Sequence, residues 1–101
     1  MNDVNLTPHG DMCFILSGAL GFDTVPAIRE QGISFFETMP EIRVDLKGVT
    51  HSDSAGLALL TEWMRFAKQH DKKITFFNIP HQMLAIARVS SLDNILPLAR
   101  G

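Results

Sequence analysis

The stretch that decides the fold is IRVDLKGVTHSDSAGLALL, residues 42–60. Its first part, Ile42 to Leu46, alternates apolar with charged residues, which is the pattern of a β-strand with one buried face. A helical pattern of apolar residues begins at Leu57. We therefore predict a strand over residues 42–46, then a polar connection, and then a helix from about Ser54 to His70.

The start of this predicted helix is unusually bare. Asp53 and Ser54 stand where a helix needs side-chain oxygens for its unpaired backbone N–H groups. Ala55 and Gly56 follow, so the first turn carries almost no side chain. We expect Ser54 to present an exposed hydroxyl on a flat helix start. Capping of the helix is an alternative role for Ser54, and stabilising the loop is one for Asp53.

The predicted helix has two unlike sides when each residue is placed about 100° on from the last. The side expected to face the sheet carries Gly56, Leu57, Leu60, Trp63, Met64 and Ala67. The opposite side carries Ser54, Ala58, Thr61, Glu62, Arg65 and Gln69. Leu59 and Phe66 widen the apolar arc, which indicates packing against a neighbouring helix. The alternative is a protein-docking surface made of Ser54, Ala55 and Ala58, with Glu62 at its edge and Leu59 contributing.

Strands and helices alternate along the rest of the chain. We predict a hairpin of two strands, a helix capped by Asp23 or Thr24 that ends near Met39, a strand and a further helix begun by Pro80. The segment 90–96 fits either a short strand or a helical turn. The predicted strands are Val4 to Thr7, Met12 to Ser17, Ile42 to Leu46 and Lys73 to Asn78. This order predicts an α/β fold with a mixed, mostly parallel sheet of four to five strands, and helices mainly on one face.

Length and composition favour one folded domain spanning residues 1–101. The formal charge is −2 and no basic cluster stands out, which argues against a nucleic-acid partner. Cys13 is the only cysteine and lies in an apolar run, so we expect a buried, inert thiol and a reducing, cytoplasmic compartment. The N-terminus does not resemble a secretory signal, and no apolar segment approaches the roughly 20 residues of a membrane span.

The chain offers little for catalysis. His51, Asp53 and Ser54 are the residue types of a hydrolytic triad, but groups so close in sequence rarely converge in the required order. The four histidines have no ligand spacing with cysteine or carboxylates, and no glycine-rich phosphate loop is present. We therefore predict no catalytic residues, no metal and no cofactor.

The segment VDLKGVTHSDSAGLALL resembles the signature of STAS domains, the fold shared by anti-sigma factor antagonists and the cytosolic domains of sulphate transporters. The resemblance extends from about Met12 to Pro97. Within the family the chain looks most like the small stand-alone, MlaB-like subunits of the bacterial Mla phospholipid-transport ABC complex, because it is short, carries GLALL after Ser54 and Ala55, and ends in SLDNILP.

This resemblance implies a non-catalytic accessory subunit. It would bind an MlaF-like ATPase subunit, with Ser54 in the contact, and support the assembly and activity of that ATPase in outer-membrane lipid asymmetry. It would be cytoplasmic and would reach the inner membrane only through its complex.

The same resemblance leaves two other functions open. In anti-sigma factor antagonists the serine matching Ser54 is phosphorylated by a partner kinase, and a phosphate adds about −1.5 to −2 charges beside Asp53. The chain departs from the commonest antagonist pattern, Asp-Ser-Ser-Gly, because Ala55 replaces the second serine. A small-ligand binder on the same fold is the third hypothesis.

Overall fold

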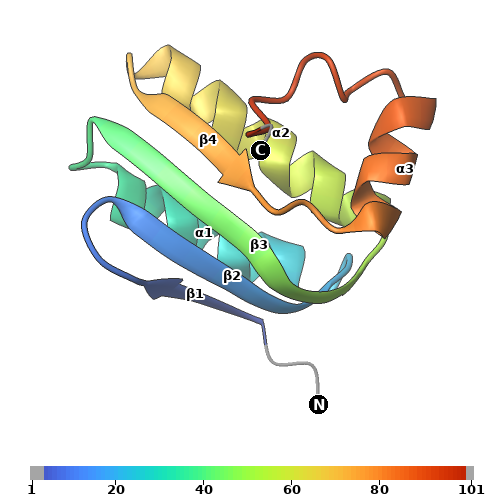
Figure 1. Ribbon diagram of the computed structural model, residues 1–101. Coiled ribbons are helices and arrows are strands. Elements are labelled where there is room, and N and C mark those ends of the chain that lie inside the picture. Colours follow the sequence, from blue (N-terminus) through green and yellow to red (C-terminus); the bar gives the residue numbers. More distant parts are fainter. Residues whose placement is uncertain (1–3, 100–101) are drawn as a thin grey trace.

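A four-stranded sheet with its strands in chain order forms the centre of the structure, a computed structural model that describes residues 4–99 (Figure 1). Strand β1 pairs antiparallel with β2, whereas the β2–β3 and β3–β4 pairs are parallel. The predicted mixed, mostly parallel α/β fold is thus confirmed. The elements are β1 (Asn5–Pro8), β2 (Cys13–Leu20), α1 (Val25–Phe36), β3 (Glu41–Ser52), α2 (Ser54–Gln69), β4 (Lys73–Phe77) and α3 (His81–Val89).

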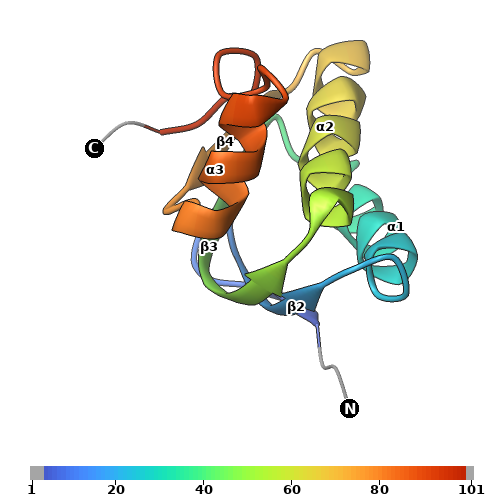
Figure 2. The same cartoon turned by 90° about the vertical axis from the view of Figure 1, so that its right-hand side faces the viewer.

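The helices cover one face of the sheet. Figure 1 views the uncovered face, with α1 and α2 behind it, and Figure 2 shows α2 between α1 and α3. The alternation that predicted β3 follows from this arrangement, because Ile42 and Val44 are buried beneath the helices while Arg43 is exposed on the other side. Helix α2 therefore lies at the centre of the helical layer.

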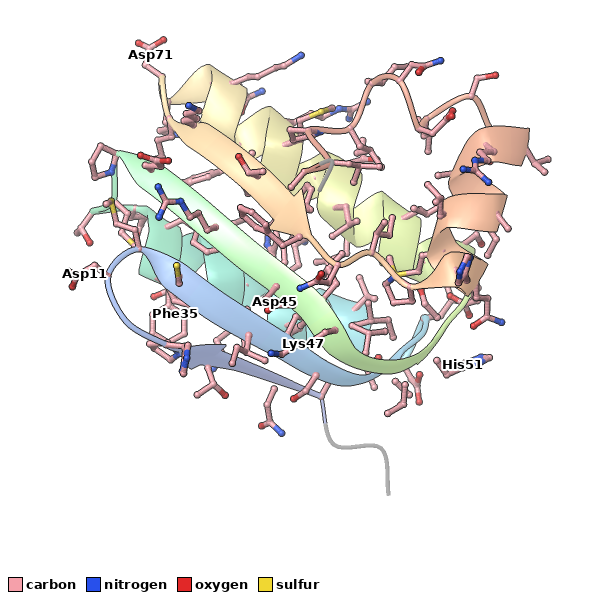
Figure 3. All side chains as sticks on the ribbon, viewed as in Figure 1. Asp11, Phe35, Asp45, Lys47, His51 and Asp71 are labelled. Atoms are coloured by element: carbon pink, nitrogen blue, oxygen red, sulfur yellow. The ribbon has the colours of Figure 1, made fainter. Side chains whose placement is uncertain are left out.

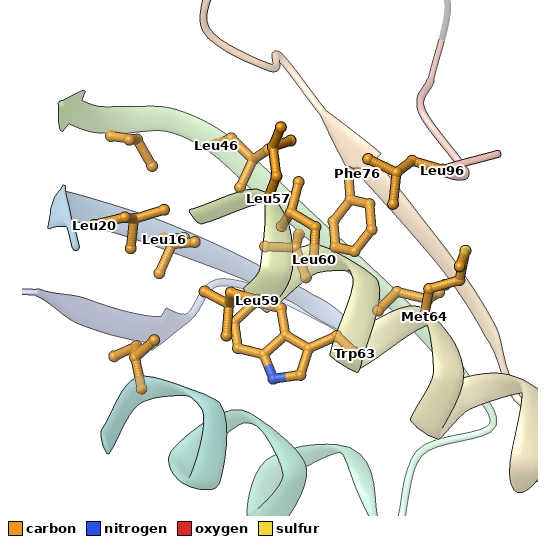
Figure 4. Close-up of a cluster of buried hydrophobic side chains, with 14 of the residues drawn as sticks. Leu16, Leu20, Leu46, Leu57, Leu59, Leu60, Trp63, Met64, Phe76 and Leu96 are labelled. Atoms are coloured by element: carbon orange, nitrogen blue, oxygen red, sulfur yellow. The ribbon is translucent and has the colours of Figure 1, made fainter. Parts of the chain in front are cut away.

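Helix α2 contributes more buried hydrophobic residues to the core than any other element described. Trp63 is fully buried between α2 and α1 (Figure 4). Its ring meets Phe36 edge-on, with centroids 5.3 Å apart. Its indole N–H donates to the Arg29 carbonyl oxygen of α1 at 3.3 Å. The ring lies directly over Gly32, where a Cβ atom would come within 2.5 Å of it. Glycine in α1 thus lets the two helices approach closely.

Strand β3 is longer than the alternation predicted. Residues 47–52, expected to be a polar connection, continue the strand and pair with the second half of β2. The pairing shifts register between Ile15 and Ser17 and again after Gly18, so the period of two is broken and the sequence looks like a loop. The predicted ends of both strands were therefore wrong, and only Asp53 separates β3 from α2.

The segment after α3 contains a helical turn, one of the two forms expected for residues 90–96, because the Leu96 N–H donates to the Leu92 oxygen at 2.9 Å. It consists of turns that bury Leu96, after which Leu98 forms an isolated parallel bridge with Phe76 of β4. The Phe76 N–H donates to the Pro97 oxygen at 2.9 Å, and the Ala99 N–H donates to the Phe76 oxygen at 2.8 Å. The end of the described chain therefore closes the outer edge of β4. Helix α1 also ends earlier than predicted, at Phe36.

We predict that Leu96→Ala lowers the free energy of unfolding by about 2–5 kcal/mol, because Leu96 is 5% exposed and its loss leaves a cavity under the closing segment. The matched control is Ile95→Ala, since Ile95 is 56% exposed and should cost less than about 1 kcal/mol. Urea unfolding of both variants measures the difference. Equal losses would show that the segment does not pack as described.

Candidate partner-binding site

The passage from β3 to α2 takes a single residue. Asp53 has extended backbone dihedrals, and its Oδ1 accepts a hydrogen bond from the Ala55 N–H at 2.8 Å. Asp53 is therefore the N-cap, and Ser54 is the first residue inside the helix. The stabilising role considered for Asp53 is confirmed, and the capping role considered for Ser54 is wrong. Two adjacent residues could both have capped, and the backbone conformation decides between them.

The Ser54 hydroxyl faces solvent. The residue is exposed, and within residues 4–99 its Oγ makes no hydrogen bond. A hydroxyl at the first turn of a helix lies beside unpaired backbone N–H groups, where an outside group can contact both. Ser54 is thus available to another molecule.

Gly56 brings the helix start onto the sheet. It is buried against Ser52, the last residue of β3, whose side chain is 1% exposed and donates from Oγ to the Asp53 oxygen at 3.0 Å. A Cβ atom on Gly56 would overlap the Ser52 Oγ and lie 3.2 Å from Leu20 Cδ1. Only glycine permits this approach, so the turn carrying Ser54 is fixed against the ends of β2 and β3.

The seven residues predicted for the contact differ in exposure and form three groups. Ser54, Ala58 and Glu62 are exposed, and their spacing of four residues places them on one line along α2. We call these three residues the Ser54 face. Asp53 is half-buried beside it. Buried residues make up the rest of the set, namely Ala55, Gly56 and Leu59.

Leu59 is 0% exposed and packs in the core, as Figure 4 shows. Of the two interpretations of the wide apolar arc, packing inside the protein is therefore confirmed for Leu59, and a direct contact from this side chain to a partner is not possible in this conformation. Phe66 is half-buried and stacks on His70 with ring centroids 4.3 Å apart. The arc was wide because α2 packs against two helices as well as the sheet.

Glu62 ends the Ser54 face with a shared ion pair. Its Oε1 lies 3.9 Å from Arg29 Nη1 of α1, and its Oε2 lies 3.8 Å from Arg65 Nη1 one turn along α2. These groups are solvent-exposed, so the pairs contribute little to stability. They do offset the carboxylate charge and hold it at the edge of the face.

Two hollows flank the Ser54 face. One is a groove of about 340 Å³ between α2 and α3, lined by Ser54 and Ala58 on one side and by Ile86 and Leu92 on the other. The second, also about 340 Å³, lies between the β2–α1 loop and the end of β3, and is lined by Gly21, Phe22, Asp23, His51 and Asp53 among others. Neither hollow was predicted from the sequence. An aromatic residue in the polar turn GFDT was the one available signal.

The uncovered face of the sheet carries a third, larger hollow of about 510 Å³. Figure 3 shows Asp45 and Lys47 on this face of β3. Asp45 Oδ1 accepts hydrogen bonds from the Lys47 N–H at 2.9 Å and from Asn78 Nδ2 at 3.0 Å. Cys13 lines the same hollow and is half-buried, so the expectation of a buried thiol was only partly met.

The residue types of a hydrolytic triad do not form one. The Asp53 Oδ1 is engaged by the Ala55 N–H, and His51 is exposed on β3, at the strand end labelled in Figure 3. Within residues 4–99 no hydrogen bond joins His51, Asp53 and Ser54, and no three His, Cys, Asp or Glu side chains gather as a metal site would need. None of the helices described is both long and apolar enough to cross a membrane.

A helix start with few side chains, on a four-stranded sheet that is covered on one face, thus defines the candidate site. The family model described as "Mlab, STAS domain" matches residues 10–97 of the chain. The chain belongs to the STAS domain family, and the resemblance seen in its sequence is confirmed.

Solved structures and a curated relative are similar along nearly the whole chain. A chain of the Acinetobacter MlaFEDB complex in its ATP-bound Vtrans2 conformation is 27% identical, with 90% of this chain and 97% of that chain covered and a TM-score of 0.77. The anti-sigma-B factor antagonist of Bacillus subtilis is 20% identical over 91 residues, which are 90% of this chain and 84% of the antagonist.

Two further structures support the fold alone. An anti-sigma factor antagonist from Mycobacterium paratuberculosis is 20% identical, covering 100% of this chain and 87% of its own, with a TM-score of 0.74. The antagonist SpoIIAA in its unphosphorylated form is 18% identical, covering 97% and 89%, with a TM-score of 0.73. The chain is therefore similar both to a component of a Mla complex and to anti-sigma factor antagonists.

We predict that Gly56→Ala lowers the free energy of unfolding by about 1–3 kcal/mol, because the added methyl group overlaps Ser52. In an open helix interior the same change stabilises by about 1 kcal/mol. A loss of stability instead of a gain would therefore show that Gly56 lies against Ser52. The second variant, Gly56→Ala with Ser52→Gly, removes the overlapping atoms and should recover part of the loss. Urea unfolding that shows Gly56→Ala to be as stable as the parent would contradict the close approach.

Proposed function

We propose that the chain is a non-catalytic cytosolic accessory subunit of a phospholipid-transport ABC transporter of the Mla type. It would bind the ATPase subunit and support that subunit's assembly and activity in maintaining outer-membrane lipid asymmetry. The observation that carries the proposal is the match to a chain of the Acinetobacter MlaFEDB complex, which is 27% identical and covered over 97% of its length. The antagonists match at 18–20% identity.

The Ser54 face supplies a physical basis for the contact. Ser54 and Ala58 are small and exposed, so a partner backbone can approach α2 closely and exchange a hydrogen bond with the Ser54 hydroxyl. A stable protein interface buries about 800 Å² on each partner, more than three side chains provide. We therefore include Asp53 and the α2–α3 groove in the proposed contact. Nucleotide hydrolysis would belong to the partner, and the chain would lie at the inner membrane through its complex.

We predict that Ser54→Lys abolishes binding to the ABC ATPase subunit of the source organism's Mla-type transporter, because a long charged side chain on the Ser54 face blocks close approach. Ala58→Leu should weaken binding strongly for the same steric reason. Ser54→Ala should weaken it less than about tenfold, since one neutral hydrogen bond contributes about 0.5–1.5 kcal/mol. Calorimetric titration of the purified proteins measures each affinity.

Gln69→Lys is the matched control, because Gln69 is exposed at the opposite end of α2 and the change adds the same charge. Circular dichroism should show that all four variants remain folded, since each replaced side chain is exposed. Full binding by Ser54→Lys would refute this face as the contact. Failure of the parent chain to bind the ATPase subunit would refute the proposed function itself.

An anti-sigma factor antagonist is the second candidate, and the free, exposed Ser54 hydroxyl favours it. A phosphate there would add about −1.5 to −2 charges next to Asp53, while the N-terminus of α2 would partly stabilise it. We predict that, if this candidate is correct, a serine kinase of the source organism that binds the chain transfers phosphate to Ser54 and to no site in Ser54→Ala. Mass spectrometry of the intact chain and its peptides measures the transfer. Absence of phosphate after incubation with that kinase would exclude this candidate.

A further inference from the structure

We propose that Phe22 and the hollow beside it extend the partner contact beyond the Ser54 face, and that this hollow receives a basic side chain of the partner. We define the Phe22 hollow by Gly21, Phe22, Asp23, His51 and Asp53. The inference rests on the proposed function, because the partner it concerns is the same ATPase subunit. It adds a second contact and a chemical requirement on the partner.

Phe22 is exposed without a structural reason inside the chain. Its side chain is 77% exposed, although an aromatic ring is among the groups that gain most from burial. Within residues 4–99 only Val89 and Ile95 are other large hydrophobic residues so placed, and neither lines the Phe22 hollow. Exposed aromatic residues near the centre of a contact often supply much of the binding energy. Phe22 is therefore the best-placed anchor next to Asp53.

The loop that carries Phe22 is held in one conformation. Thr24 Oγ1 accepts a hydrogen bond from the Gly21 N–H at 2.9 Å and donates to the Ala19 oxygen at 3.0 Å. The Val25 N–H donates to the Gly21 oxygen at 2.9 Å, which joins the loop to the first turn of α1. A partner would therefore meet a ring whose backbone is already ordered, so binding loses less conformational entropy.

The charge of the hollow points to a basic group. A Cβ atom built on Gly21 would lie 3.3 Å from Asp23 Oδ1 and 3.7 Å from Asp53 Oδ2, so the two carboxylates converge over the glycine. No lysine or arginine lines the hollow, and within residues 4–99 neither aspartate forms an ion pair. A guanidinium group can pair with carboxylates and also lie against an aromatic ring. Arginine is thus the side chain that fits best.

The two contacts are continuous. Asp53 borders the Phe22 hollow with Oδ2, whereas its Oδ1 caps the helix whose first residue is Ser54. A partner that approaches Ser54 closely must therefore also cover the rim of the hollow. Together the Ser54 face and the Phe22 hollow give one surface around the start of α2.

The test compares Phe22→Ala with Ile95→Ala in calorimetric titrations against the purified ATPase subunit. Phe22→Ala should weaken binding at least about tenfold, as expected for loss of one buried aromatic contact. Ile95→Ala removes an exposed apolar side chain from the hollow at the C-terminal end of α2 and should stay within twofold. Asp23→Asn should also weaken binding and reduce its dependence on salt. Both Phe22→Ala and Asp23→Asn should unfold at the parent's urea midpoint.

A probe that does not depend on the partner tests the hollow itself. N-acetyl-arginine amide, added at millimolar concentration, should shift the backbone amide resonances of residues 21–24 and Asp53 in a saturable way. Phe22→Ala and Asp23→Asn should abolish these shifts, and N-acetyl-glutamine amide should not produce them. Shifts that are absent from the parent chain would overturn the basic-group assignment.

The outcomes separate this inference from the proposed function. If Ser54→Lys abolishes binding while Phe22→Ala stays within twofold of the parent, the Phe22 contact is refuted and the Ser54 face stands. If Phe22→Ala weakens binding while Ser54→Lys binds fully, the Phe22 contact stands and the Ser54 face is refuted. If the parent does not bind the ATPase subunit, the proposed function fails, and the arginine titration alone decides whether the hollow receives a basic group.

Discussion

The close contact between Gly56 and Ser52 is the constraint on which the site depends. Because Gly56 has no Cβ atom, the first turn of α2 rests on the buried side chain that ends β3. The chain then needs only Asp53 to pass from strand to helix, and that residue also caps the helix through Oδ1. A longer connection would leave Ser54 on a loop of variable shape, whereas here its position is fixed by the sheet.

A second glycine, Gly32 of α1, determines how closely the other side of α2 packs against α1. Gly32 lets the Trp63 ring approach the backbone of α1 closely, and the indole N–H donates to the Arg29 oxygen there. Helix α2 is consequently buried against the sheet and α1, and eight of its sixteen residues are buried. The residues left for an outside partner are those on the remaining side, which include the Ser54 face. The two glycine contacts thus explain why the Ser54 face is narrow and is held in a fixed position.

Much of the fold followed from the sequence because its main signals are local. The alternation of β3, the apolar stripe of α2 and the alternating order of elements each reflect burial on one side. The ends of β2 and β3 could not be predicted, since the register shifts near Ser17 and Gly18 depend on how the two strands pair. The site was predicted in part. The exposure of Ser54 and the packing of Leu59 followed from their positions on the helix, whereas the two flanking hollows depend on how α2 lies beside α3 and beside the β2–α1 loop.

Phe22 was beyond sequence reasoning for a different reason. The Thr24 hydrogen bonds hold the loop that carries Phe22, and its proximity to Asp53 arises because β2 and β3 end side by side. Neither the conformation of this loop nor its proximity to Asp53 produces a pattern in the local sequence. A negative hollow beside Ser54 also bears on the two candidate functions.

A phosphate on Ser54 would add negative charge next to Asp23 and Asp53, and a basic partner group would be attracted more strongly by it. Charge alone would then favour binding, so a phosphate that blocked the contact would have to act through its size and the cost of desolvating it against a flat helix start. On the proposed contact, added bulk at Ser54 or Ala58 would therefore hinder recognition more than added negative charge would.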